Sequence, residues 1–276
     1  MSRTWFITGA SSGFGRLLTE RLLARGDRVA ATARRPETLA DLGKEHGDRL
    51  WTASLDVTDI PAMRRAVDRA FRELGRIDVV ASNAGYGLFG AAEELGDEQI
   101  GSLIETNLIG SIQLIRAVIP HLRNQGGGRI LQVSSEGGQM AYPGFSLYHA
   151  SKWGIEGFVE AVRQEVAPFG ITFTLVEPGP TQTNFAAGLV TAEPAPAYEK
   201  TPVGNLRRAW ADGSFTAKGD PAKMVEAMIA SAETENGPLR LTFGATAYAS
   251  IGNALRGRLA ELEGQRDAAL SMDLDG

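Results

Sequence analysis

A glycine-rich turn between a predicted strand and a predicted helix constrains this chain more than any other feature. The apolar run at 5–7 precedes the turn, and a segment with helical spacing at 17–23 follows it. Gly9 permits a tight turn, Gly13 lets the backbone approach a diphosphate, and Gly15 lets the helix pack close to the strand. The free N–H groups at the start of a helix favour anionic phosphates. The spacing Gly-x3-Gly-x-Gly is a relative of the dinucleotide fingerprint, so the turn predicts a dinucleotide site.

Strand-like and helix-like segments alternate along most of the chain. Short apolar runs predict strands at 5–7, 28–33, 50–55, 77–82, 130–134, 172–176 and 239–243. Helical spacing predicts helices after the glycine turn, after Asp59, and at 97–124, 148–167, 221–232 and 245–262. This alternation predicts an α/β fold, a Rossmann-type doubly wound and mostly parallel seven-stranded sheet with helices on both faces. We expect a single domain over 1–276, with a substrate lid at about 179–220 and a helical C-terminal tail at about 245–276.

Composition excludes several classes of protein. The chain has 276 residues, a net charge of −5 and no cysteine, so disulfides, thiolate catalysis and cysteine-ligated zinc are excluded. The acidic balance argues against nucleic acid and anionic membrane surfaces as partners. His46, His121 and His149 lack a metal-ligand spacing, so we predict no metal site. The N-terminus does not read as a signal peptide, and no run approaches the ~20 apolar residues of a spanning helix, so we expect a cytoplasmic protein without a membrane partner.

A tyrosine and a lysine one helical turn apart are the first candidates for acid–base chemistry. Tyr148 and Lys152 are four positions apart, which places both side chains on one helix face. An ammonium ~4 Å from the phenol contributes about 4 kcal/mol at an effective dielectric of ~20. That lowers the phenol pKa by up to about 3 before desolvation opposes it. The second candidate is the strand end at Ser134 and Ser135, where a hydroxyl can hydrogen-bond a substrate carbonyl.

Several motifs follow one another in the order and register typical of one family. They are Thr8-Gly9-x3-Gly13-x-Gly15, Asp56-Val57, Asn83-Ala84-Gly85, Asn107, Ser135, Tyr148-x3-Lys152 and Pro178-Gly179. On these motifs, which extend to about Phe243, the chain resembles the single-domain branch of the short-chain dehydrogenase/reductase family. The part past the sixth predicted strand is most similar to hydroxysteroid-dehydrogenase-like members. Ser82 departs from the family pattern, which often has a second asparagine there.

The resemblance implies a catalytic set of four residues. Tyr148 would donate a proton to the carbonyl oxygen in reduction and remove it in oxidation, while Ser135 holds that oxygen. Lys152 would lower the pKa of Tyr148 and bind the nicotinamide ribose, and Asn107 would anchor a water through which protons reach bulk solvent. The residues implied to bind the cofactor are Gly9, Ser11, Ser12, Gly13, Phe14, Gly15, Arg34, Asp56, Val57, Asn83, Ala84, Gly85, Tyr148, Lys152, Pro178, Gly179, Thr181 and Thr183.

The end of the second predicted strand indicates which nicotinamide cofactor is used. An acidic residue there would bond the ribose 2′-hydroxyl and repel a 2′-phosphate. This chain has Ala33 followed by Arg34 and Arg35, and a guanidinium can bind a phosphate through two hydrogen bonds. We therefore predict NADP(H), with Arg34 as the main contact and NAD(H) as the alternative cofactor. Asp56 and Val57 should flank the adenine, and Asn83 and Gly85 the adjoining ribose.

Apolar residues follow several of these motifs and predict the substrate class. They are Tyr86, Leu88, Phe89, Tyr142, Phe145 and Phe185. They favour a medium or bulky hydrophobic ketone, aldehyde or secondary alcohol, although several could instead belong to the core. Small residues on the helix after Tyr148, together with the resemblance, favour a homodimer or homotetramer. Two alternatives stay open, a 3-oxoacyl thioester reductase and a non-catalytic NADPH-binding sensor.

Overall fold

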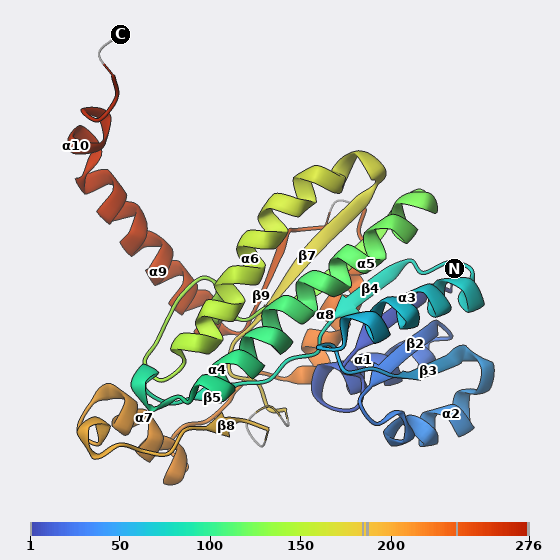
Figure 1. Ribbon diagram of the computed structural model, residues 1–276, viewed down its shortest axis with the longest axis horizontal. Helices are drawn as coiled ribbons and strands as arrows, with labels where there is room; N and C mark the ends of the chain where they lie inside the picture. Colours follow the sequence, from blue (N-terminus) through green and yellow to red (C-terminus); the bar gives the residue numbers. More distant parts are fainter. Residues whose placement is uncertain (1, 184, 186–187, 236, 275–276) are drawn as a thin grey trace.

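A sheet of seven parallel strands forms the centre of the protein (Figure 1). The computed structural model describes residues 2–183, 185, 188–235 and 237–274. The strand order is β3-β2-β1-β4-β6-β7-β9. The strands are β1 Thr4–Thr8, β2 Arg28–Ala33, β3 Leu50–Ser54, β4 Val79–Ser82, β6 Gly128–Val133, β7 Ile171–Pro178 and β9 Arg240–Phe243. The predicted doubly wound sheet is confirmed, and every pair in it is parallel rather than most of them.

Helices cover both faces of the sheet, because each strand alternates apolar side chains between two hydrophobic clusters. The helices are α1 Gly13–Ala24, α2 Ala40–His46, α3 Ile60–Leu74, α4 Asp97–Ile104, α5 Gly110–Asn124, α6 Ser146–Val166, α7 Pro202–Ala211, α8 Pro221–Glu233, α9 Ala245–Gly264 and α10 Arg266–Leu270. On one face α3, α5 and α6 pack around Phe6, Val80 and Ile130. On the other face α1, α2 and α8 pack around Ile7 and Ala81. Neighbouring residues of β1 therefore point into different clusters.

The strand order reverses direction at β1, and this reversal locates the site. β1 pairs with β2 on one side and with β4 on the other. The helices that follow β1 and β4 lie on opposite faces of the sheet, so a crevice opens at the carboxyl ends of these two strands. Thr8 ends β1 and Ser82 ends β4. Apart from Asn107, which lies within the long helical stretch, the motifs of the predicted site follow the carboxyl end of a strand or begin a helix at that edge.

The predicted long helix at 97–124 is present with one local change. It runs through α4 and α5, and the residues between them, Glu105–Ile109, form a π-helical turn. Such turns place one extra residue in a helix and are frequent at functional sites. By length and composition alone the stretch Asp97–Asn124 could cross a membrane. Its apolar face, with Leu114 and Val118, is fully buried against the sheet, which explains that composition.

Three of the helices and strands, α2, β5 and β8, were not predicted from the sequence. Helix α2 is short, and its apolar residues Leu39 and Leu42 are too few to show a helical period. The two-residue strands β5, Leu88–Phe89, and β8, Val190–Thr191, form a second small parallel sheet. Helix α7 lies in the segment predicted as a lid. Together with β5 and β8 it occupies one end of the molecule in Figure 1, while α9 and α10 project away from the body.

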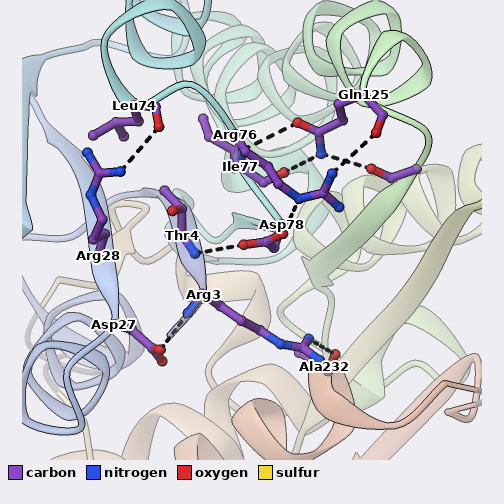
Figure 2. A network of polar contacts seen from close by, with 11 residues as sticks. Arg3, Thr4, Asp27, Arg28, Leu74, Arg76, Ile77, Asp78, Gln125 and Ala232 are labelled. Atoms are coloured by element: carbon purple, nitrogen blue, oxygen red, sulfur yellow. Dashed lines mark hydrogen bonds and ion pairs between the residues drawn. The ribbon is translucent and has the colours of Figure 1, made fainter. Parts of the chain in front are cut away.

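Polar contacts fix the opposite edge of the sheet, where the strands begin (Figure 2). Thr4 donates its backbone N–H to Asp78 at 2.9 Å, and Arg3 donates its backbone N–H to Asp27 at 2.8 Å. The amide of Gln125 donates to the backbone oxygen of Ile77 at 2.7 Å. These bonds satisfy backbone groups at the edge of the core and leave the carboxyl edge free for a ligand.

Candidate active site

The glycine turn after β1 has the geometry of a phosphate cradle. Gly9 has φ +69° and Gly13 has φ +55°, conformations that favour glycine. A Cβ on Gly15 would lie 2.3 Å from the backbone oxygen of Gly9, so the helix and the turn could not pack this closely with any side chain there. A Cβ on Gly13 would meet no atom of the protein within 4 Å. Gly13 therefore faces open space at the start of α1, where a diphosphate fits.

No side-chain acceptor of the first turn occupies the free N–H groups at the start of α1. The N-cap residue Ser12 makes no side-chain capping bond, and the first turn contains no acidic residue. Ser11 and Ser12 are exposed. Phe14 is partly buried and packs against the cluster beneath α1. The helix N–H groups are thus available to an anion, and the residues present fit a dinucleotide.

Asn83 holds the glycine turn in place. Its side-chain amide donates to the backbone oxygens of Thr8, at 2.9 Å, and of Gly9, at 3.2 Å. The Thr8 hydroxyl in turn accepts the backbone N–H groups of Asn83 and Ala84 at 3.0 and 3.2 Å. The Asn83 amide nitrogen is therefore engaged with the turn, a bracing role that the sequence did not suggest for a residue expected beside the ribose.

The carboxyl ends of β2 and β3 present a basic and an acidic residue to solvent. Arg34 is exposed directly after β2, and its charge contributes to the lowered pKa of Asp56. The largest cause of that lowering is the backbone N–H of Thr58, 3.0 Å from the Asp56 carboxylate. Val57 is buried beneath Asp56. No carboxylate occupies the position after β2, and the arrangement can accept an anionic group beside Arg34.

Ser135 and Tyr148 come together at the carboxyl end of β6. Ser135 is extended and caps the short turn Glu136–Gly138, because its hydroxyl accepts the Gly137 N–H at 3.1 Å. Tyr148 lies in the first turn of α6 and is 7% exposed. The pKa of Tyr148 is raised to about 12. Burial is the main cause, a hydrogen bond with Ser135 opposes it, and the nearby carboxylate of Glu136 adds to the rise. The phenol is therefore a neutral proton donor at ordinary pH.

Lys152 lies beside Tyr148, as the spacing of four predicts. Its ammonium lies 5.5 Å from the centre of the Tyr148 ring and donates to the backbone oxygen of Val133 at 3.0 Å. Burial lowers the pKa of Lys152 to about 8. The Tyr148 pKa lies above the usual value of a phenol because desolvation is its largest cause, so the lowering of this pKa by Lys152 stays a prediction.

Asn107 lies in the π-helical turn and is 1% exposed. Its side-chain oxygen accepts the backbone N–H of Tyr86 at 3.0 Å, and its side-chain nitrogen donates to the Tyr86 backbone oxygen at 2.8 Å. A Cβ on Gly85 would lie 3.1 Å from the same amide. Asn107 therefore anchors the loop after β4. The water that the resemblance implies for Asn107 stays a prediction.

Two further residues of the site were missed as functional candidates. Glu136 is 3% exposed, and its carboxylate accepts a hydrogen bond from Ser250 at 2.7 Å at the base of α9. His149 is buried, accepts the Tyr142 N–H at 3.3 Å through Nε2, and bonds the Gly137 oxygen at 3.0 Å through Nδ1. An N–H donor at Nε2 implies that the proton resides on Nδ1. No sequence pattern marks either residue, since both act through tertiary contacts.

The loop after β7 closes another side of the site. Gly179 donates its N–H to the Phe243 oxygen at 3.0 Å, which places the segment from Pro178 next to β9. The hydroxyl of Thr181 donates to the Gly179 oxygen at 2.8 Å, and the hydroxyl of Thr183 accepts the Phe185 N–H at 3.2 Å. Residues 184, 186 and 187 of the predicted lid lie outside the described residues. The loop therefore has its own internal bonds beside the cradle.

The apolar residues near Tyr148 divide into core and rim. Leu88, Phe89 and Phe145 are at most 5% exposed and belong to one cluster with Tyr148 and Val203 of α7. They are core, as the alternative interpretation allowed. At the rim, the ring of Phe185 lies 5.8 Å from that of Tyr148, edge to face, and is 42% exposed. Tyr86 and Tyr142 are partly buried beside the same cluster. An apolar rim thus borders the phenol.

Known proteins are similar to this chain in sequence and architecture. The family model described as short chain dehydrogenase matches residues 3–194. Oxidoreductase BOA17 of Botryotinia fuckeliana is 36% identical over 98% of this chain and 99% of its own. The 17-beta-hydroxysteroid dehydrogenase type 1 of Homo sapiens is 34% identical over 75% of this chain and 66% of its own. A short-chain dehydrogenase from Streptomyces avermitilis superposes with a TM-score of 0.91 at 38% identity, covering 99% of both chains. The chain therefore belongs to the short-chain dehydrogenase/reductase family, whose members are NAD(P)-binding oxidoreductases.

Proposed function

We propose that the protein is an NADP(H)-dependent oxidoreductase that interconverts a hydrophobic ketone or aldehyde and its alcohol, with Tyr148 as general acid and base. One observation carries this proposal. Ser135, Tyr148 and Lys152 lie together at the carboxyl edge of the sheet, on the same edge as an open glycine cradle. The bound dinucleotide supplies the hydride. The protein binds and orients the reactants and moves the proton.

The proton path in the reducing direction begins at the Tyr148 hydroxyl. Ser135 holds the carbonyl oxygen, and as that oxygen gains negative charge Tyr148 transfers its proton to it. The neutral phenol is ready for this step, because burial keeps its pKa at about 12. The ammonium of Lys152 then lies beside the new phenolate and stabilises it. In oxidation the same groups act in reverse, and the phenolate removes the alcohol proton.

Preference for NADP(H) rests on Arg34. This guanidinium is exposed after β2 with no carboxylate at the position that would select the 2′-hydroxyl. A bidentate contact to a phosphate suits its geometry. The cofactor residues proposed on the remaining edge are Gly9, Ser11, Ser12, Gly13, Phe14, Gly15, Asp56, Val57, Asn83, Ala84, Gly85, Pro178, Gly179, Thr181 and Thr183.

The hydrophobic substrate is supported by the rim around the phenol. Phe185 and Leu189 both approach Gly87, where a Cβ would lie 2.6 Å from each side chain. An apolar group next to the carbonyl would meet these side chains and Tyr142. A 3-oxoacyl thioester also carries an apolar chain and is the second candidate. We expect a homodimer or homotetramer, since α6 presents small exposed residues such as Gly157.

Activity assays on matched tyrosine variants test the proposal. Oxidation of NADPH should be followed across a panel of hydrophobic ketones, aldehydes and a 3-oxoacyl thioester. Tyr148→Phe should lower kcat by about 100-fold to 10,000-fold, the usual contribution of a positioned acid. Tyr142→Phe, a tyrosine in the same cluster, should retain activity. NADPH binding without turnover of any substrate would favour the sensor, and full activity of Tyr148→Phe would overturn the assignment.

A further inference from the structure

We propose that α9 is an interaction surface for a second copy of this chain, paired antiparallel with the same helix about a two-fold axis near Leu259. The helix is 20 residues long and leaves the body of the protein at its base, as Figure 1 shows. Of its residues only Ala247 and Ile251, both near the base, are buried. A helix of this length is not held by its own propensity alone and normally needs packing on one face.

One face of α9 carries an apolar stripe without a partner among the described residues. Tyr248, Leu255 and Leu262 recur every seven residues, and Leu259 lies on the same face between the last two. Their exposed fractions are 79%, 46%, 60% and 52% respectively. A seven-residue repeat keeps side chains on a single seam, which is the pattern of helices that pair with another helix. Leu270 of α10 continues the apolar surface toward the C-terminus.

Charged residues beside the stripe would lie opposite residues of the other sign in a second copy that runs antiparallel. Arg256 and Glu263 lie seven residues apart on one flank of the stripe, while Arg258 on the other side stacks over the ring of Trp153, 4.8 Å from its centre. Reversing the helix about Leu259 places Arg256 opposite Glu263 of the partner subunit, and by symmetry Glu263 opposite Arg256 of the partner subunit. Antiparallel pairs contact through like flanks, so both of these contacts join opposite charges. Within the described residues neither Glu261 nor Glu263 forms an ion pair.

Apolar contacts agree with the same register. Leu255 then meets Leu262 of the partner subunit, and Leu259 meets its own equivalent at the axis. The exposed ring of Tyr248 at the base of one helix meets the free end of the other near Leu270 of the partner subunit. The macrodipoles of two antiparallel helices also attract each other, whereas those of two parallel helices lying side by side do not. Every large apolar residue of the stripe is covered by this arrangement.

Charge also favours a protein partner over a lipid surface. The segment 245–276 holds three arginines and five carboxylates, whereas helices that lie on anionic membranes are rich in lysine and arginine on the polar face. The occupant is therefore a second copy of this chain. This pairing is separate from any contact through α6, since the two surfaces lie on different helices.

Cysteine cross-linking tests the pairing directly, because the chain has no cysteine of its own. Leu259→Cys in the full chain should form a disulfide-linked dimer on mild oxidation, since only residues near the axis meet their own equivalents. Ala260→Cys, on the opposite face of the helix, should stay uncrosslinked. Tyr248→Cys should also stay uncrosslinked alone, but should link to Leu270→Cys when the two proteins are mixed. The antiparallel register would be overturned if Tyr248→Cys formed a disulfide-linked dimer by itself and Leu259→Cys did not.

Light scattering supplies a second measurement. Leu255→Glu combined with Leu262→Glu should lower the solution mass of the protein at least twofold while leaving the fold intact by circular dichroism. Arg256→Glu should weaken self-association by about threefold to tenfold, and adding Glu263→Arg should restore it. An unchanged mass for the double leucine variant would overturn the proposal. The proposal would also be overturned if the parent protein sedimented with phosphatidylcholine vesicles and the double leucine variant did not. That result would assign the stripe to a membrane.

Discussion

The ammonium of Lys152 lies 5.5 Å from the centre of the Tyr148 ring and is held there by the backbone oxygen of Val133. Burial lowers the pKa of Lys152 to about 8 and raises that of Tyr148 to about 12. Burial therefore shifts both groups toward their neutral forms, although Lys152 still carries its charge below about pH 8. Lys152 loses its proton first as the pH rises, and the phenol keeps its proton throughout the neutral range.

This order predicts the pH dependence of carbonyl reduction. Tyr148 must be protonated, which holds up to about pH 12, while Lys152 must be charged to stabilise the phenolate, which holds only up to about pH 8. We expect kcat/KM for the cofactor, which reports the pKa values of the free enzyme, to fall as the pH rises through about 8. Lys152→Arg keeps its charge at every accessible pH and should move that fall upward.

A fall near pH 8 that is the same in Lys152→Arg would contradict this assignment. The variant must first be shown to bind NADPH, because the same side chain is proposed to contact the ribose. Fluorescence quenching by NADPH measures that binding independently of turnover.

The sequence predicted the sheet and the placement of the motifs because both depend on local signals. Apolar runs and glycine spacing located β1, the turn at Gly9 and the start of α1, and a spacing of four put Tyr148 and Lys152 on one face. The pKa of Tyr148 could not be predicted in the same way. It depends on how deeply the phenol is buried and on the carboxylate of Glu136, which the fold alone places nearby.

Contacts between segments that are distant in the sequence could not be predicted from it either. The side-chain oxygen and nitrogen of Asn107 both bond the backbone of Tyr86, a contact that no sequence pattern indicates. The strands β5 and β8 are too short for a period and pair only because the chain returns after a hundred residues. The sequence alone leaves open whether Phe89 contacts substrate or belongs to the core, and its burial in a cluster with Trp210 makes it core.

Replacing Arg34 should change the choice of cofactor. Arg34→Ala removes the only proposed contact to the 2′-phosphate, so KM for NADPH should rise about tenfold or more while KM for NADH stays nearly constant. Arg35→Ala is the matched control, since Arg35 is the next residue and is also exposed. Steady-state kinetics with both cofactors gives the ratio. An equal rise in KM for NADH and NADPH would mean that Arg34 does not contact the 2′-phosphate.

Two glycines of the cradle should respond differently to alanine. Gly15→Ala places a Cβ 2.3 Å from the Gly9 oxygen and 2.6 Å from the Asn83 amide, so the turn must shift, at a cost of about 1–3 kcal/mol in stability. Gly13→Ala meets no protein atom, and the cost is the ~1–2 kcal/mol of a left-handed alanine. Its methyl group, however, enters the space proposed for the diphosphate.

Thermal unfolding with and without NADPH separates these effects. Gly15→Ala should show the larger fall in Tm without ligand, and Gly13→Ala should lose the rise in Tm that NADPH gives the parent protein. A normal NADPH-induced rise in Gly13→Ala would argue that the phosphates bind elsewhere.

Glu177 should make the stability of the protein depend on pH. Its side chain is fully buried at the end of β7 and accepts bonds from Gln139 and Thr242, while Arg240 is shared with the neighbouring carboxylate of Glu156. Burial and the charge of Glu156 raise the pKa of Glu177 to about 7. Between the ordinary carboxyl pKa and pH 7 the folded protein holds a proton that the unfolded chain has lost. Stability therefore falls as the pH rises through this range.

Glu177→Gln removes that proton and should flatten the decline between pH 5 and pH 8, as measured by urea unfolding at several pH values. Glu160→Gln is the matched control, because Glu160 binds the same guanidinium at 2.8 Å but Arg240 lowers its pKa. A carboxylate with a lowered pKa contributes stability that is lost only as the pH falls, so the control should keep the parent's decline above pH 5. Equal slopes for parent and Glu177→Gln would show that the buried carboxyl group is ionised at pH 5 and that Arg240 outweighs its desolvation.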